Sequence, residues 1–306
     1  MDNVDIDLLQ EITGVENAKF SGAYNIRKDG QGIERKITEN VNIVTKKDVS
    51  GIDIYVKENT KYEFIHIPVI ITESGLNDVV YNDFYIGENA KVTIIAGCGI
   101  HNDHHKDSQH DGIHRFFLEK GAKVKYIEKH YGEGSGTGKR ILNPVTEVYL
   151  KDGATMEMDS VQIKGVDSTA RVTKGVLDDN TNLVVSEKIL THGEQFAKTS
   201  FEVELNGENS STKVTSRSVA TENSKQEFSS KVIGNNKCFG HVECDAIIKD
   251  NAKIIAIPEI VANNVEANLI HEAAIGKIAG EQLTKLMTLG LTEKEAEDAI
   301  INGFLK

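Results

Sequence analysis

The chain has few of the residues that interrupt or crosslink a fold. Its 306 residues include three prolines, three cysteines and no tryptophan. Three cysteines do not make the disulfide framework of a small secreted protein, so each thiol is expected to be structural, catalytic or a metal ligand. Because proline occurs only at positions 68, 144 and 258, long uninterrupted β-sheets are possible. An aromatic content of 6% fits a fold built from stacked aliphatic side chains.

Two further absences exclude classes of partner. The net charge is −12, so the basic surface that binds nucleic acids or anionic membranes is missing. No apolar run approaches the roughly 20 residues that cross a bilayer. Residues 1–7 are acidic, whereas a signal peptide begins with positive charge. We therefore expect a cytoplasmic protein with no nucleic-acid and no membrane partner.

A weak internal repeat is the main indication of architecture. Each copy has a short turn, composed of a charged residue, Asn or Gly, and a small residue, followed by an alternating apolar run. The turns lie at 58–60, 88–90, 120–122, 152–154, 179–181 and 250–252. Ala90, Ala122 and Ala154 recur at equal spacing. A unit that cannot bury its own apolar face must stack on neighbours, so the repeat predicts a β-solenoid, with a β-sandwich as the alternative.

The pattern divides the chain into three parts. Helical spacing at 5–13 and an alternating strand at 52–56 predict a small N-terminal α/β region, 1–62. The repeats predict a β-helix core, 63–262. Beyond it, the apolar spacing becomes helical, and Thr292–Glu295 forms a capping box, which predicts a C-terminal helical segment, 263–306. These helices are too short to form a domain, so we expect them to pack on the solenoid or on another protein.

A glycine-rich run at 132–140 has the composition of a phosphate-binding loop but not its spacing. Glu133 stands where such a loop needs glycine, and Lys139 precedes Arg140 rather than Ser or Thr. We therefore expect a surface loop, and a chain that does not itself bind ATP.

The segment 101–114 is rich in histidine and aspartate, but its spacing fits no known metal motif. It is either a solvated loop between coils or a site of metal or iron entry, with carboxylates supporting the imidazoles. Cys98 lies just before this segment, at the end of an apolar run, and is expected to be a small buried hydrophobic residue.

The junction between solenoid and helices carries the remaining candidate ligands, which are Cys238, His241, Cys244, His271 and Glu272. Five residues lie between the two thiols, unlike the closer pair of a zinc knuckle or redox site. One chain cannot supply four thiolates, so a metal or iron–sulfur site here would need imidazole, carboxylate or a second chain. Such mixed ligation holds a cluster less tightly, which suits a protein that gives the cluster away.

Several segments of this junction and of the helices resemble the C-terminal block of the SufB/SufD family, the scaffold of the SUF iron–sulfur assembly machine. They are 240–248, 256–260, 270–278, 281–283, 290–296 and 301–304. The resemblance is dense from about residue 200 to the end and thinner before it. It implies a right-handed parallel β-helix with a helical C-terminal segment, pairing through the β-helices, and a SufC-type ATPase carried on the terminal helices.

The resemblance also assigns residues. Cys244 matches the SufB cysteine implicated in cluster assembly, and His271 and Glu272 match the SufB His-Glu pair. We therefore expect Cys244, His271 and Glu272 to bind the cluster as metal ligands, and we expect no catalytic residues. The chain is much shorter than full-length SufB and lacks a cysteine motif near its start, yet unlike SufD it retains Cys244 and Glu272. This predicts a homodimer, or else a pair with a SufD-like paralogue.

These expectations combine into one function. The chain is expected to be a scaffold, not an enzyme, that builds a transient iron–sulfur cluster at a subunit interface and passes it to apo iron–sulfur proteins. ATP would bind only to a SufC-like ABC-type ATPase docked on the terminal helices. Two alternatives remain: a metal-free structural partner of such an ATPase, and a β-helix carbohydrate-active enzyme. The acidic charge and the missing signal peptide count against the enzyme.

Overall fold

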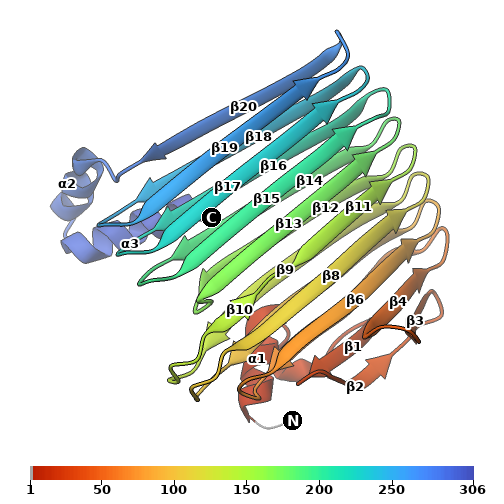
Figure 1. Cartoon of the computed structure of the whole chain (residues 1–306), viewed down its shortest axis with the longest axis horizontal. Helices are drawn as coiled ribbons and strands as arrows, with labels where there is room; N and C mark the ends of the chain where they lie inside the picture. The colour runs from red at the N-terminus through yellow and green to blue at the C-terminus, as the bar shows by residue number, and fades with distance from the viewer. Residues whose placement is uncertain (1–2) are drawn as a thin grey trace.

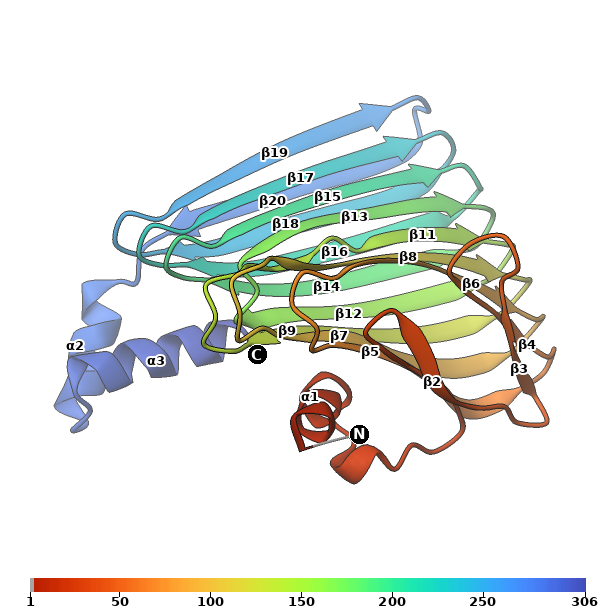
Figure 2. The same ribbon diagram turned by 60° about the horizontal axis from the view of Figure 1, so that its bottom comes forward.

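The computed structural model describes residues 3–306, apart from the side chain of Lys164. The chain winds into a parallel β-solenoid of about 8 turns, so the predicted fold class is confirmed. Two long sheets face each other, as Figures 1 and 2 show. Each coil contributes one strand to each sheet. Two hairpins at the N-terminal end of the chain, β1–β2 and β3–β4, are antiparallel.

Sheet I contains, in spatial order, β2 (Gln31–Lys36), β1 (Ala23–Lys28), β5 (Lys61–Ile71), β7 (Lys91–His101), β9 (Lys123–Glu133), β12 (Thr155–Lys164), β14 (Asn182–Thr191), β16 (Ser210–Ala220), β18 (Cys238–Ile248) and β20 (Ala267–Gly276). Sheet II contains β19 (Lys253–Ala262), β17 (Lys225–Gly234), β15 (Phe196–Leu205), β13 (Ser168–Leu177), β10 (Arg140–Leu142) with β11 (Val145–Leu150), β8 (Ser108–Leu118), β6 (Asn77–Ile86), β4 (Gly51–Val56) and β3 (Val41–Thr45).

The turns found in the sequence are the corners of the coils. In the first five of them the central residue has a positive φ angle: 60° at Asn59, 56° at Asn89, 65° at Gly121, 72° at Gly153 and 56° at Asn180. Asn and Gly adopt this conformation at low cost, which explains their recurrence. The backbone N–H of each of these residues donates to a carbonyl of the same turn in the next coil, at N···O distances of 2.8–3.0 Å. The repeat is therefore a stack of turns.

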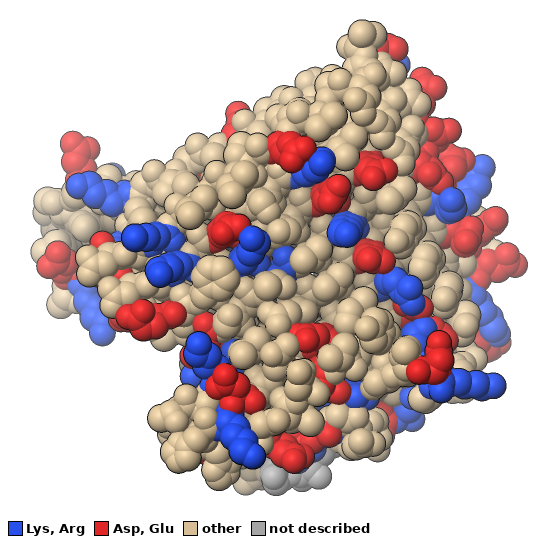
Figure 3. Space-filling model, in the orientation of Figure 1, with Lys and Arg blue, Asp and Glu red and all other residues tan. Residues whose placement is uncertain are grey.

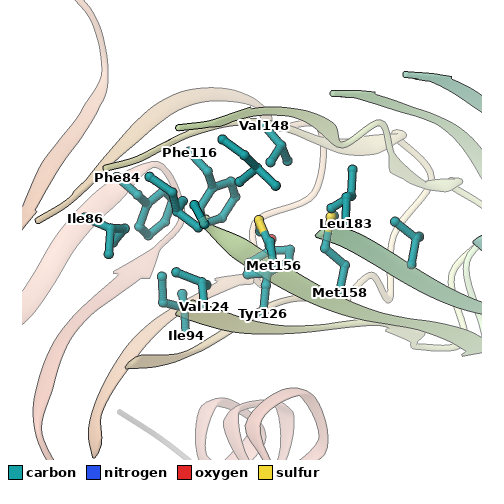
Figure 4. Packing of buried hydrophobic residues seen from close by; sticks show 14 of the residues in the cluster. Phe84, Ile86, Ile94, Phe116, Val124, Tyr126, Val148, Met156, Met158 and Leu183 are labelled. Carbon is teal, nitrogen blue, oxygen red and sulfur yellow. The ribbon is translucent and has the colours of Figure 1, made fainter. Parts of the chain in front are cut away.

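The interior between the two sheets is apolar over most of its length. Isoleucine, leucine and valine side chains from successive coils stack there, as the low aromatic content predicted. The coils nearer the N-terminus differ, because Phe84 and Phe116 stack with ring centroids 4.3 Å apart and Tyr126 meets Phe116 edge-on. Figure 4 shows these rings among the aliphatic side chains of neighbouring coils.

Helix α1 (Asn3–Thr13) and the short η1 (Glu16–Ala18) lie against the outer face of sheet I. Leu8, Leu9 and Ile12 of α1 are buried there. The strand beneath has glycines at the contact: a Cβ on Gly97 would lie 2.8 Å from the Cβ of Ile12. The absence of a side chain at Gly97 therefore allows the helix to approach the sheet closely.

Most of the glycine-rich run, residues 134–139, forms the loop between β9 and β10, as expected. Added Cβ atoms at Gly134, Gly136 and Gly138 would overlap backbone atoms of the loop at 102–106. These glycines therefore let two loops of neighbouring coils pack closely.

Helices α2 (Gly280–Thr288) and α3 (Glu293–Phe304) follow the last coil and extend from one side of the solenoid. They lie within the predicted segment 263–306, whose first part is strand β20. The predicted capping box is present: the Glu295 N–H donates to Thr292 Oγ1 at 3.3 Å, and the Thr292 N–H donates to Glu295 Oε2 at 2.8 Å. None of the helices among residues 3–306 is long and apolar enough to cross a membrane.

We predict that this fold loses stability in mild acid because it buries neutral histidines. Burial lowers the pKa of His114 on β8 to about 4, whereas a histidine in the unfolded chain titrates near about 6.5. At a pH between the folded-state and unfolded-state pKa values, the unfolded chain binds more protons than the folded one. The free energy of unfolding therefore rises with pH, and this contribution is complete above the unfolded-state pKa. His114→Gln should reduce the difference between urea midpoints measured at about pH 7 and about pH 5.

The exposed His104 supplies the matched control, since His104→Gln should leave the pH dependence of the urea midpoint as in the wild type. An unchanged pH dependence in His114→Gln would contradict the assignment of the acid sensitivity to this side chain.

Candidate functional site

The three predicted ligands lie on the last two strands of sheet I. Cys244 is on β18, and His271 and Glu272 are on its hydrogen-bonded neighbour β20. In the parallel register, His271 stands opposite Val242 and Glu272 opposite Glu243. Because side chains alternate along a strand, Cys244 and His271 share the inner face of the coil, whereas Glu272 lies on the outer face.

Cys244 and His271 form the inner pair. Cys244 is 2% exposed, and His271 is its diagonal neighbour on the next strand, at a Cα separation of about 7–8 Å. Across the interior, His271 Nδ1 lies 3.4 Å from Ser230 Oγ on β17. His271 Nε2 is buried and has no hydrogen-bond partner among the described residues. Such a nitrogen is costly to bury and is available to a ligand.

The electrostatics of the inner pair favour a neutral site. Burial raises the pKa of the Cys244 thiol to about 11, with smaller contributions from the negative charges of Glu187 and Asp245. Burial also lowers the pKa of His271, so its imidazole is neutral at neutral pH. A neutral imidazole binds a metal directly, whereas the thiol must first lose a proton, which a nearby cation favours.

Glu272 belongs to an outer pair with His241. The His241 Nε2 and Glu272 Oε2 atoms are 3.0 Å apart, and the Glu272 side chain is 66% exposed. Within one chain the structure therefore does not bring Glu272 to Cys244. This separation could have been predicted from the sequence, because residues 271 and 272 are neighbours in an alternating strand and such neighbours point to opposite faces.

The other two cysteines lie apart from this site. Cys238 shares the inner face of β18 with Cys244, but six residues of strand separate them by about 20 Å, too far for one metal ion. Cys98 on β7 is 3% exposed, as expected, and burial raises its thiol pKa well above the usual value.

The histidine-rich segment divides into two parts. At the end of β7, His101 lies 2.8 Å from an oxygen of Asp103 in the following loop and 3.0 Å from a Glu133 oxygen. From Ser108 onward the segment is strand β8, and His110 and His114 are buried on its inner face. The interpretation of 101–114 as a solvated loop is therefore wrong for 108–114, because alternation with outward polar residues makes this part a strand.

A buried polar cluster near Cys244 was missed by the sequence analysis. Arg171 on β13 pairs with Glu128 on β9, and its Nε lies 3.4 Å from Glu187 Oε1 on β14. Glu187 accepts a hydrogen bond of 3.0 Å from Ser216, the register partner of Cys244. The interior next to Cys244 is therefore polar on one side. Charged residues at inward positions of alternating runs are the signal that could have revealed it.

No group of three or more His, Cys, Asp or Glu side chains within residues 3–306 is placed to hold a metal ion. One chain thus offers an incomplete ligand set, with two inner ligands.

This incomplete set lies at an open end of the solenoid. Strands β19 and β20 each have a hydrogen-bonded neighbour on one side only, and Figure 1 shows them at the end opposite α1. Apolar side chains on them are exposed: Ile255 by 53%, Ile257 by 49%, Ile260 by 44% and Ile275 by 43%. Unpaired edges of this kind are templates for pairing with another chain.

Comparison with protein families gives one match that covers most of the chain. Residues 69–304 match a family model described as "SUF system FeS cluster assembly, SufBD core domain". The matched region includes Cys244, His271, Glu272 and both terminal helices.

Individual relatives agree with this match. The chain is 29% identical to an iron-sulfur cluster assembly SufBD family protein of Methanocaldococcus jannaschii, over 82% of this chain and 79% of that protein. It is 29% identical to a SufBD family protein of Methanothermobacter thermautotrophicus, over 78% of this chain and 57% of that protein. It is 25% identical to the iron-sulfur cluster assembly protein SufB of Bacillus subtilis, over 84% of this chain and 55% of that protein. The chain thus spans little more than half the length of the latter two.

Proposed function

Because this chain belongs to the SufBD family of SUF iron–sulfur cluster assembly proteins, we propose that it is the scaffold on which a cluster is built and from which it is released. The observation that carries the proposal is the inner pair, Cys244 and His271, at the open end of the solenoid. The cluster is cargo, and no bond of a small substrate is made or broken by a catalytic side chain, so the protein is a scaffold and not an enzyme.

A second copy of the chain completes the ligand set in this proposal. A homodimer related by a two-fold axis presents the same surface twice, so edge strands meet their own counterparts in antiparallel fashion. Joining the open ends brings two Cys244 thiols and two His271 imidazoles to one seam. Glu272 is exposed on the outer face, and by leaving its partner His241 it would reach the cluster at this seam from either copy. A SufD-like paralogue with the same open end would serve in place of the second copy.

Thiolate, imidazole and carboxylate give the mixed ligation that a transfer site needs. Thiolates hold iron–sulfur clusters most firmly, and replacing some of them by harder ligands weakens the hold. The cluster is therefore transient and passes to apo iron–sulfur recipient proteins. The Cys244 protons leave as the metal binds, so assembly should be favoured at higher pH.

The terminal helices are the proposed docking site of a SufC-like ABC-type ATPase. Helix α2 buries none of its residues, and α3 is joined to the solenoid by a 2.6 Å ion pair between Lys249 and Glu297. ATP binds to the ATPase alone. The closing of two docked ATPase subunits moves the helices and reshapes the seam. The free energy for this motion comes from the difference in nucleotide affinity between the open and the closed ATPase pair. The expected location is the cytoplasm.

We predict that Cys244→Ala abolishes cluster formation, because a thiolate is the strongest soft ligand at the site. Cys238→Ala is the matched control, since it changes the same residue type on the same face of the same strand, and Cys98→Ala is a second. Both should retain the cluster. Anaerobic reconstitution with iron and sulfide, followed by iron and sulfide counting and visible absorption, measures this.

His271→Ala and Glu272→Ala should each lower cluster content or stability, and all variants should keep the wild-type circular dichroism. Normal cluster content in Cys244→Ala would refute the assignment. A wild-type protein that never forms a coloured cluster would favour a metal-free structural partner of the ATPase.

We also predict a dimer that depends on the open end. Ile260→Glu combined with Ile275→Glu places two charges on the inward side of the last coil and should yield monomers, because pairing would bury them. Val44→Glu changes an equally exposed residue at the other end of the solenoid and should leave the dimer intact. Light scattering at micromolar concentration distinguishes these outcomes, and a monomeric wild type, alone and with the ATPase, would exclude this arrangement.

A third prediction concerns the helices. A chain lacking 280–306 should no longer co-purify with its ATPase, while its circular dichroism keeps the solenoid signal. Met287→Glu, which places a charge on an exposed apolar position of α2, should weaken the complex, whereas Gln282→Glu on the opposite side should not. Undiminished co-purification of the truncated chain would show that the ATPase binds elsewhere.

A further inference from the structure

Three lysines form a row on the outer face of sheet I. Lys61, Lys91 and Lys123 begin strands β5, β7 and β9, and each is the register partner of the next. All three are exposed, and no ion pair among the described residues includes any of them. Like charges directly opposite each other on neighbouring strands repel. The row is therefore a local concentration of positive charge in a chain of net charge −12.

The outer face of sheet II shows that the fold can avoid such repulsion. There, Arg115, Glu147, Lys174 and Glu202 are successive register partners, so that positive and negative charges alternate from strand to strand. On the face seen in Figure 3, basic and acidic side chains likewise lie side by side. The lysine row therefore does not follow from the solenoid architecture.

A strained aromatic residue stands next to the row. Tyr62 is 81% exposed and has a φ of 60°, and the register of β5 and β7 shifts between Lys61 and Glu63. Tyr62 is thus an extra residue in the ladder, and an extra residue of this kind redirects a side chain as a β-bulge does. A bulky residue with positive φ is uncommon, and it is retained where the conformation serves a purpose. Here the bulge directs an aromatic ring into solvent, where it gains nothing from the core.

Tyr62 and three lysines, Lys91, Lys123 and Lys125, line an open groove of about 400 Å³. The next two strands add Thr155, Asn182 and one carboxylate, Glu157, so the cations outnumber the anions in the groove. Helix α1 packs over the glycines farther along β7, so the groove remains uncovered by this chain. Its lining residues come from five neighbouring strands, β5, β7, β9, β12 and β14, so the groove crosses the strands as an extended polypeptide would.

We propose that this groove binds an acidic, extended segment of a partner protein, whose carboxylates pair with the lysine row and whose apolar side chain packs on Tyr62. Flexible lysine side chains accommodate carboxylates at varied spacing. The charge is complementary to an acidic peptide. A nucleic acid would need a longer basic track than three lysines on an acidic protein. This surface is separate from the open end and from the terminal helices.

Fluorescence anisotropy tests the proposal with the full-length protein and a fluorescein-labelled peptide of about 12 residues, in which glutamate alternates with serine and leucine. Binding should be salt-sensitive, because exposed charges are screened. Lys91→Glu with Lys123→Glu should weaken binding by about tenfold or more, and a peptide with glutamine in place of glutamate should not bind.

The double variant Lys36→Glu with Lys47→Glu is the matched control, since it changes the net charge equally at two exposed lysines elsewhere. Its affinity should stay within about twofold of the wild type. Tyr62→Gly should weaken binding while the melting temperature holds or rises, because glycine relieves the positive φ. Equal weakening by both double variants, no effect of Tyr62→Gly, or tighter lysine-dependent binding of single-stranded DNA of equal charge would overturn the proposal.

Discussion

Backbone hydrogen bonds between each coil and the next are the constraint on which the rest of this molecule depends. In a solenoid, each unit contacts only its neighbours, so every coil relies on the one before and after it for both hydrogen bonds and burial. The stacked Asn and Gly turns keep the coils in register at the corners. At the N-terminal end the two hairpins stop this propagation. At the other end β19 and β20 leave the ladder unfinished, so the same interaction that builds the fold also defines the edge at which we propose that a second chain pairs.

The alternation of side chains along a strand determines what each residue at that end can do. Inward positions are shielded, so Cys244 is held as a neutral thiol and His271 as a neutral imidazole. Outward positions meet solvent, so Glu272 pairs with His241. The inner pair and Glu272 lie on opposite faces of one coil, so the proposed site would combine them only where that coil meets another chain. The incomplete ligand set of a single chain is thus a geometric consequence of the fold.

The parts of the structure that could be predicted from the sequence are those that depend on short, local sequence patterns. The turn repeat predicted the solenoid, because positive φ at a corner restricts the choice of residue to a few types. The Thr292–Glu295 capping box predicted the start of α3 for a similar reason. The burial of Cys98 followed from an apolar run. The inner and outer assignment of His271 and Glu272 was also contained in the alternation, but the family resemblance treated them as one pair.

What could not be predicted depends on contacts between distant coils. Arg171, Glu128 and Glu187 lie on three different strands, and their inward positions in alternating runs do not tell which of them pair. His110 and His114 looked like loop residues because their neighbours are polar, yet their inward positions on β8 bury them. A charged triad inside an apolar solenoid carries a large desolvation cost that only mutual pairing offsets. Glu187 of this triad accepts a hydrogen bond from Ser216, the register partner of Cys244, so the buried thiol has a polar neighbour in the adjacent coil.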